Sequence, residues 1–251
     1  TSTDNFVQTK LDEEVLSNEI LRVRVLFVIF FSLGFFLSAV TLLAPDAFDL
    51  ASGGGVSPYL PAMFFLPVSG VFLVLYFALK TRSSIGPAVQ YVTAFLETSI
   101  PTVAIYVLSL IREPATVALH LPPAYVYFVF IVLSGLRLSG RLCVFTGAVA
   151  GIQYFALSAW LTHVAREGLD PALDLMFLHF AKSVIYFLVG GLMAWVTERN
   201  KRKMLAGFSA LEERNQIRSV FGQHVSPAVV DELLQQGAAD TGSTREVCVL
   251  F

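Results

Sequence analysis

Six long apolar segments dominate the sequence and restrict the folds that this chain can adopt. They run approximately through residues 23–43, 59–79, 88–111, 122–138, 140–164 and 174–197. Each segment is close to the ~20 residues that a helix needs to cross a bilayer. Because hydrocarbon cannot hydrogen-bond an exposed backbone, each segment is predicted to be an α-helix. The sequence therefore predicts an all-α membrane protein with a six-helix transmembrane domain over residues 23–197.

The composition agrees with a membrane protein and excludes other classes. Hydrophobic residues make up 55% of the chain and charged residues only 14%, whereas soluble domains carry about 25% charged residues. The net charge of −2 provides no basic field, so we expect no nucleic-acid partner. Cys143 and Cys248 form no disulfide framework and no CxxC metal motif. The polar start of the chain does not resemble a cleavable signal peptide.

Lysines and arginines are distributed unevenly between the two ends of the predicted spans. Arg112 and Arg166 lie on one side. The other side carries Lys10, Arg22, Arg24, Lys80, Arg82, Arg137, Arg141, Arg199, Lys201, Arg202 and Lys203. Because cytoplasmic loops are enriched in cations, we expect a multi-pass protein of the cell (inner) membrane with both termini in the cytoplasm. The short loops around 44–58, 112–121 and 165–173 then face outward.

Two polar segments flank the transmembrane domain. Residues 1–22 are predicted to form an amphipathic cytoplasmic helix, either a solvated leader or a helix packed on the membrane surface or on the C-terminal stalk. Residues 198–220 are charged and favour a helix that continues the sixth span. The a/d-type positions of this helix are Leu205, Phe208, Glu212 and Asn215. This seam favours a short parallel coiled-coil stalk between two copies of the chain, and a solvated juxtamembrane helix is the alternative.

The last residues, 221–251, carry a helix signal followed by a strand signal. Ser226 and Pro227 are typical of a helix start, Gly237 of a helix end, and 245–251 of a buried strand. The sequence FGQHVSPAVVDELL over 221–234, followed by REVCVLF over 245–251, resembles the entry into a class III adenylate/guanylate cyclase domain of the bacterial type. His224 stands where an aromatic residue is common in that family, and Cys248 where threonine is common.

The resemblance implies a function for the parent protein that this chain does not itself perform. Cyclases of this class make a cyclic nucleotide, here cAMP from ATP, with two Mg²⁺ or Mn²⁺ ions held by two carboxylates. Those carboxylates and the residues that recognise the purine would follow Phe251, so no catalytic residue is assigned here. For the same reason the sequence does not distinguish ATP from GTP as the substrate of the parent protein. We expect the chain to be the anchor, dimerisation and regulatory module of a longer, homodimeric cyclase, whose catalytic domain is its downstream partner.

Ionisable residues inside the predicted spans are candidates for a functional site, because charge in hydrocarbon is unfavourable. Glu97 and Lys182 both fall near mid-bilayer, and their long side chains are predicted to be able to meet. Pro101 follows Glu97 by four residues and removes the helical partner of its carbonyl. The interpretations are a structural ion pair, a protonated Glu97, or a site for a small ligand, ion or proton.

Three histidines, His120, His163 and His179, lie near the predicted outer face. Imidazoles combined with the nearby carboxylates suit Zn²⁺ or a similar ion, although their spacing is not a motif. The alternatives are interfacial polar residues without a ligand and a haem-binding redox sensor.

Gly147 and Gly151 form a GxxxG pattern in the fifth span, which serves either a dimer contact or internal helix packing.

The sequence is compatible with three functions. The first is a sensory module for a membrane or external ligand, and the second is a passive anchor in the lipid bilayer. The third is a transporter or channel, for which no internal inverted repeat is evident.

Overall fold

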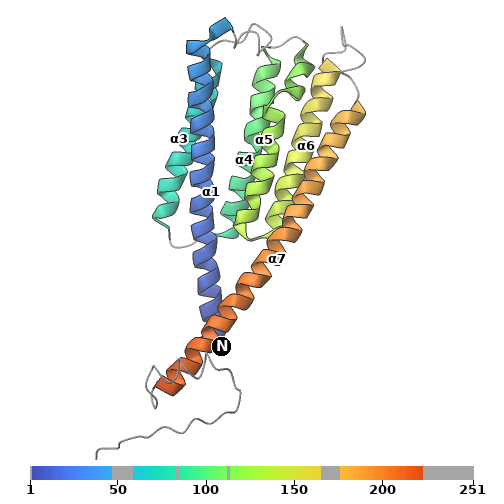
Figure 1. Cartoon of the computed structure of the whole chain (residues 1–251). Helices are drawn as coiled ribbons and strands as arrows, with labels where there is room; N and C mark the ends of the chain where they lie inside the picture. Colours follow the sequence, from blue (N-terminus) through green and yellow to red (C-terminus); the bar gives the residue numbers. More distant parts are fainter. Residues whose placement is uncertain (1, 47–58, 83–84, 112–113, 165–175, 223–251) are drawn as a thin grey trace, which may run out of the picture. The chain divides into compact units, whose positions relative to one another are not determined.

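The computed structural model describes residues 2–46, 59–82, 85–111, 114–164 and 176–222. These residues form the helices α1 (Ser2–Leu43), α3 (Leu60–Lys80), α4 (Pro87–Ser109), α5 (Pro123–Ser134), α6 (Gly140–Val164) and α7 (Met176–Gly222), with two 3₁₀ helices, η1 (Ala115–His120) and η2 (Gly135–Arg137) (Figure 1). The described part of the chain contains no strand. It has six helical segments long and apolar enough to cross a membrane, which confirms the predicted all-α class with six spans.

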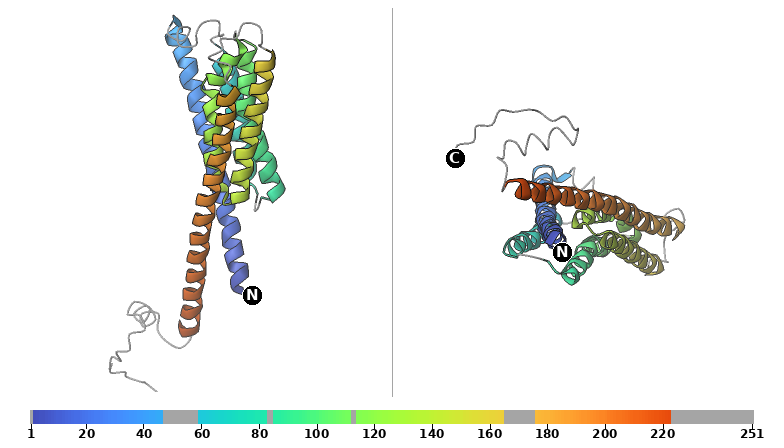
Figure 2. Two further views of the ribbon diagram at one scale, coloured as in Figure 1. Left: turned by 90° about the vertical axis from the view of Figure 1, so that its right-hand side faces the viewer. Right: turned by 90° about the horizontal axis from the view of Figure 1, so that it is seen from below.

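The chain divides into two compact units. The larger unit is Thr9–Lys203, and the second combines Thr1–Gln8 with Met204–Phe251. Within the larger unit the long helices run side by side as one bundle, as both views of Figure 2 show. The helix and strand expected within 223–251 lie outside the described residues.

Two helices continue beyond the ends of the predicted transmembrane domain. The helix predicted for 1–22 and the first span form the single helix α1, and no glycine or proline occurs before Gly34. Likewise, the sixth span and the charged segment after Thr197 are both part of α7, a helix of 47 residues. The first proline after α7 is Pro227, so no proline interrupts this helix.

The fourth crossing differs from its prediction. α5 has 12 residues, about 18 Å of helix at 1.5 Å per residue, which is too short to cross the hydrocarbon. The span is completed by η1 before it and η2 after it, giving 23 residues from Ala115 to Arg137. Residues 115–120 were expected in an outward loop, but Ala118 and Leu119 are fully buried. Their apolar side chains draw this segment into the bundle.

The bundle has two hydrophobic clusters. One is centred on α1 and α3, where the ring of Phe30 packs against Phe72 and also against Phe130 of α5. The other lies among η1, α4, α5, α6 and α7. In contrast, Phe35 and Leu43 are 66% and 86% exposed. Exposed apolar side chains of this kind are what a lipid-facing surface requires.

Glycines set the close approach of α6 and α7. A Cβ atom on Gly147 would lie 2.8 Å from the Cα of Gly190, and one on Gly151 would lie 2.8 Å from the carbonyl oxygen of Ser183. Real Cβ atoms do not come so near to backbone atoms, so only glycine permits this contact. Of the two uses predicted for the GxxxG pattern, the structure shows internal packing.

Candidate functional site

Four buried ionisable side chains meet in the bundle, and we call them the charge cluster. They are Glu19 and Arg22 of α1, Glu97 of α4 and Arg137 of η2. Each is at most 7% exposed. Two carboxylates and two guanidinium groups balance in formal charge. The cluster therefore joins three helical segments by ion pairs inside a membrane-spanning bundle.

Glu97 is the carboxylate that both arginines share. Its Oε2 accepts hydrogen bonds from Nη1 of Arg22 and from Nη2 of Arg137, the latter at 3.1 Å. Arg22 also donates from Nε to Oε2 of Glu19 at 2.8 Å, and Nε of Arg137 lies 3.3 Å from Oε1 of Glu19. Arg137 further donates from Nη1 to the carbonyl oxygen of Gln90. Each arginine thus contacts both carboxylates.

Local sequence explains how these side chains are positioned. Glu19 and Arg22 are three residues apart, so they lie on one face of α1. The fully buried Val23 and Leu26 bring this region of α1 against the bundle. Arg137 ends the short helix η2, and Leu138 follows with a left-handed φ of 52°. Since that conformation is unfavourable for leucine, the turn into α6 is held by its surroundings.

The charge cluster leaves little space for a ligand. A recess beside it is lined by both arginines and Glu97, and by the hydroxyl residues Thr98, Ser134 and Thr146 among others, but it is too narrow to hold a water molecule. Oε1 of Glu97 has no hydrogen-bond partner among the described residues. A buried acceptor without a partner is unfavourable, so this carboxylate relies on the two arginines. The geometry is that of a set of buried ion pairs that joins three helical segments.

The predicted meeting of Glu97 with Lys182 does not occur. Glu97 pairs with the two arginines, whereas Nζ of Lys182 lies 3.5 Å from the carbonyl oxygen of Leu119 and 5.8 Å from the centre of the Tyr154 ring. The reason is depth. Glu97 lies in the half of α4 that begins at Pro87, near the turn that carries Arg137, and Lys182 lies near the opposite end of the bundle at the start of α7.

Pro101 is buried and α4 continues through it. The sequence predicted a site at the backbone carbonyl of Glu97, which the proline leaves without its helical hydrogen bond. In the structure, the group of Glu97 that contacts other side chains is its carboxylate. Thr102, the next residue, belongs to a separate polar network. Its hydroxyl donates to Oε1 of Gln153 at 2.7 Å and lies 2.6 Å from the Tyr127 hydroxyl, and Nε2 of Gln153 donates to Ser99 at 2.8 Å.

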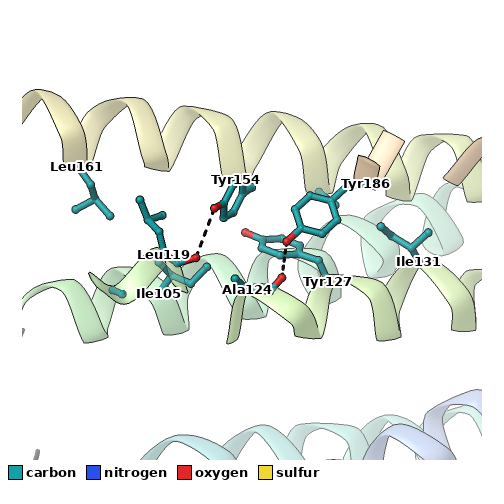
Figure 3. Packing of buried hydrophobic residues seen from close by; sticks show 10 residues of the cluster. Ile105, Leu119, Ala124, Tyr127, Ile131, Tyr154, Leu161 and Tyr186 are labelled. Atoms are coloured by element: carbon teal, nitrogen blue, oxygen red, sulfur yellow. Dashed lines mark hydrogen bonds between the residues drawn. The ribbon is translucent and has the colours of Figure 1, made fainter. Parts of the chain in front are cut away.

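A second buried group, which we call the aromatic cluster, consists of Tyr127, Tyr154, Tyr186 and His179. Figure 3 shows the three tyrosines packed between the helices, with the Tyr186 hydroxyl donating to the carbonyl oxygen of Ala124 at 2.5 Å. The Tyr154 hydroxyl lies 2.9 Å from Nδ1 of His179. This cluster is held by ring contacts and neutral hydrogen bonds.

The structure brings together two of the three histidines proposed as metal ligands. The rings of His120 and His179 have centroids 5.6 Å apart, and His163 is exposed at the end of α6. Within the described ranges, no group of three or more His, Cys, Asp or Glu is arranged to hold a metal ion. The acidic residues expected near these histidines lie outside those ranges; they are Glu113, Glu167, Asp170 and Asp174.

The candidate stalk residues lie in α7 beyond the bundle unit. Leu205, Phe208 and Glu212 are half-buried, and Asn215 is exposed. Pairing of two stalks stays a prediction.

Sequence reasoning missed three members of the charge cluster. Glu19 was assigned only to the predicted N-terminal cytoplasmic helix, and Arg22 and Arg137 were counted as cations flanking the membrane. Two features of the sequence pointed to the cluster. Glu19 and Arg22 are three residues apart, and a carboxylate within a membrane span, such as Glu97, requires a cation as its partner.

Comparisons of the chain with protein-family models, curated proteins and solved structures find no match.

Proposed function

We propose that this chain is the membrane module of a class III adenylate cyclase. It anchors the enzyme, brings two copies together, and relays a change in the transmembrane bundle to a catalytic domain that follows residue 251. The proposal rests on the resemblance of residues 221–251 to a cyclase entry and on the form of the helix that precedes them.

The observation that carries the proposal is the continuity of α7. Its 47 residues correspond to about 70 Å of helix, and only about 30 Å is needed to cross the hydrocarbon. The helix is apolar up to Thr197 and charged beyond it. An uninterrupted helix transmits rotation or axial movement better than a flexible linker. Thus α7 suits a relay between a bundle and a downstream domain.

The turn formed by residues 135–140 is well placed to connect the charge cluster to α7. Arg137, in this turn, binds Glu97 and Glu19. On the other side of the turn, the Thr197 hydroxyl lies 3.5 Å from the carbonyl oxygen of Gly135, and the Gly140 amide donates to Oε1 of Glu198 at 3.1 Å. These two α7 residues are where its charged segment begins. A shift of Arg137 would therefore reach the start of the stalk through direct contacts.

Regulation requires two states that differ in their contacts. In this proposal one state keeps the charge cluster intact, and the other separates α1 from α4 and η2. Leu205, Phe208 and Glu212 occupy a/d-type positions of α7, and this spacing supports stalk pairing, in which the register of the two helices sets the geometry of the catalytic domains.

The test uses the full-length protein, meaning this chain with its native downstream sequence, in bacterial membranes. Cyclic nucleotide formation is measured from ATP and from GTP. Alanines are inserted after Ser209. Insertion of three or four residues changes the rotation of the stalk below this point relative to the bundle, and insertion of seven residues, which is about two helical turns, restores the original rotation. We expect seven residues to leave activity within about twofold of the parent, and three or four to change it several-fold.

The outcomes separate the alternatives. No cyclic nucleotide from either substrate would reject the cyclase assignment. Activity that is independent of the insertion length, and is also unchanged by Arg137→Gln, would identify the chain as a passive anchor. Activity that follows the stalk phase supports the relay.

A further inference from the structure

On α7, exposed apolar side chains give way abruptly to exposed cations. Leu188, Leu192 and Trp195 are 62%, 58% and 61% exposed, as expected for residues that face lipid. One turn later Arg199 is exposed, with its guanidinium carbon 5.7 Å from the centre of the Trp195 ring. Tryptophan is enriched at the boundary between hydrocarbon and headgroups. This contact therefore marks the membrane interface on α7.

Three other helices show the same transition near this end of the bundle. An exposed cation lies one turn from an exposed apolar residue in α1, where Arg24 precedes Val28, and in α3, where Lys80 follows Phe77. Arg141 is exposed at the start of α6, which the Gly140–Glu198 hydrogen bond places at the level of the interface on α7. The cations thus surround the bundle instead of belonging to one helix.

The nearby acidic groups are already engaged. Glu198 accepts a hydrogen bond from the Gly140 amide, and Glu19 is buried against Arg22 and Arg137. In contrast, the opposite end of the bundle presents no exposed lysine or arginine among the residues that the structure describes. Within the described ranges, the surplus of positive charge at the α7 interface is therefore local, and no ion pair joins these exposed cations to a carboxylate.

We propose that this end of the bundle binds the headgroups of anionic glycerophospholipids. The binding surface, which we call the cationic ring, consists of Arg24, Lys80, Arg141, Arg199, Arg202 and Lys203. Phosphodiester oxygens accept paired hydrogen bonds from guanidinium groups, and clusters of cations beside a membrane span attract anionic lipids. The acyl chains then lie along the exposed apolar side chains of the same helices. This inference does not depend on the cyclase assignment.

Tryptophan quenching tests the proposal, because the chain has only two tryptophans. The variant Trp160→Phe retains Trp195 beside the ring, and Trp195→Phe retains Trp160 near the far end of α6. Each variant of the chain is reconstituted in phosphatidylcholine–phosphatidylglycerol vesicles of fixed composition, with bromine on the acyl chains of one lipid or the other. For each brominated lipid, the quenching of tryptophan fluorescence is expressed per mole of that lipid. The readout is the value for brominated phosphatidylglycerol divided by the value for brominated phosphatidylcholine.

We expect this ratio to be at least about 2 for Trp195, because each cation near the surface attracts anionic lipid, and about 1 for Trp160. Adding R199Q/R202Q/K203Q to the Trp160→Phe background should bring the ratio to about 1. Adding Lys10→Gln, a residue already paired with Glu13 at 2.6 Å, should leave it unchanged. A ratio near 1 for Trp195 with the ring intact, or a ratio that survives R199Q/R202Q/K203Q, would overturn the proposal.

Discussion

The charge cluster and the aromatic cluster both provide hydrogen-bond or charge partners for buried polar groups, but with different interactions. Both place polar groups inside a bundle that hydrocarbon surrounds. The charge cluster uses four full charges, and its central carboxylate, Glu97, is shared by Arg22 and Arg137. The aromatic cluster uses several neutral ring contacts and single hydrogen bonds, such as that of Tyr154 with His179. Loss of one charge leaves the buried cluster with an uncompensated net charge, whereas loss of one ring contact leaves the other contacts in place.

This difference predicts that a single substitution in the charge cluster lowers the stability of the protein more than one in the aromatic cluster. Glu97→Gln leaves Arg22 and Arg137 facing the single carboxylate of Glu19, and should lower the free energy of unfolding by about 3–5 kcal/mol. Equilibrium unfolding in mixed detergent micelles measures the loss. The matched control is Glu13→Gln, which removes an exposed ion pair with Lys10 and should change stability by about 0.5 kcal/mol or less. A loss below about 1 kcal/mol for Glu97→Gln would show that the cluster is not a central support.

The glycine contact beside the aromatic cluster should give an intermediate effect. Gly147→Ala places a Cβ 2.8 Å from the Gly190 Cα and 2.9 Å from the Tyr186 carbonyl oxygen, so α6 and α7 must separate. The expected loss is about 1–3 kcal/mol, measured by the same unfolding titration. Gly191→Ala is the control, since a Cβ there meets no atom within 4 Å and should cause no loss. Equal effects of the two substitutions would refute the close packing of α6 on α7.

Within the aromatic cluster, removal of one hydroxyl should have a smaller effect. Tyr154→Phe keeps the ring contacts and removes the hydroxyl that bonds His179 at 2.9 Å and, more weakly, the Leu119 carbonyl oxygen at 3.5 Å, with an expected loss of about 0.5–1.5 kcal/mol. Tyr125→Phe, at a residue that is 58% exposed, should be close to neutral in the same titration. A loss for Tyr154→Phe as large as that of Glu97→Gln would remove the contrast between the clusters.

The smallest effect is expected for the energetic coupling between Glu97 and Lys182. Since the two side chains have separate partners, a double-mutant cycle of Glu97→Gln and Lys182→Met should give an interaction energy within about 0.5 kcal/mol of zero. The cycle of Glu97→Gln with Arg137→Gln should instead give about 0.5–3 kcal/mol. A large coupling with Lys182 would restore the pairing that the sequence suggested.

The sequence predicted the positions of most membrane-spanning helices accurately, but it predicted the contacts of the polar side chains less well. The segment predicted over 140–164 matches α6 to the residue, and the predictions for α3 and α4 agree within two residues at each end. Helix formation in hydrocarbon depends on local apolarity and on backbone hydrogen bonds within one segment, both of which are visible in the sequence. The short helix α5 was harder to delimit, since apolar 3₁₀ turns extend its span at both ends.

The partners of the polar side chains depended on tertiary structure. Glu97 was identified as a buried functional candidate from its position alone, but its pairing with Arg22 and Arg137 required the helices to be set at definite depths and rotations. Those quantities follow from side-chain packing between helices, such as the approach of Gly147 to Gly190, and not from the periodicity of any one helix. The sequence by itself therefore determined the six segments that are apolar enough to cross a membrane and the point in α7 at which charged residues begin. Only the tertiary structure decided which charges meet, because that requires distances between segments far apart in the chain.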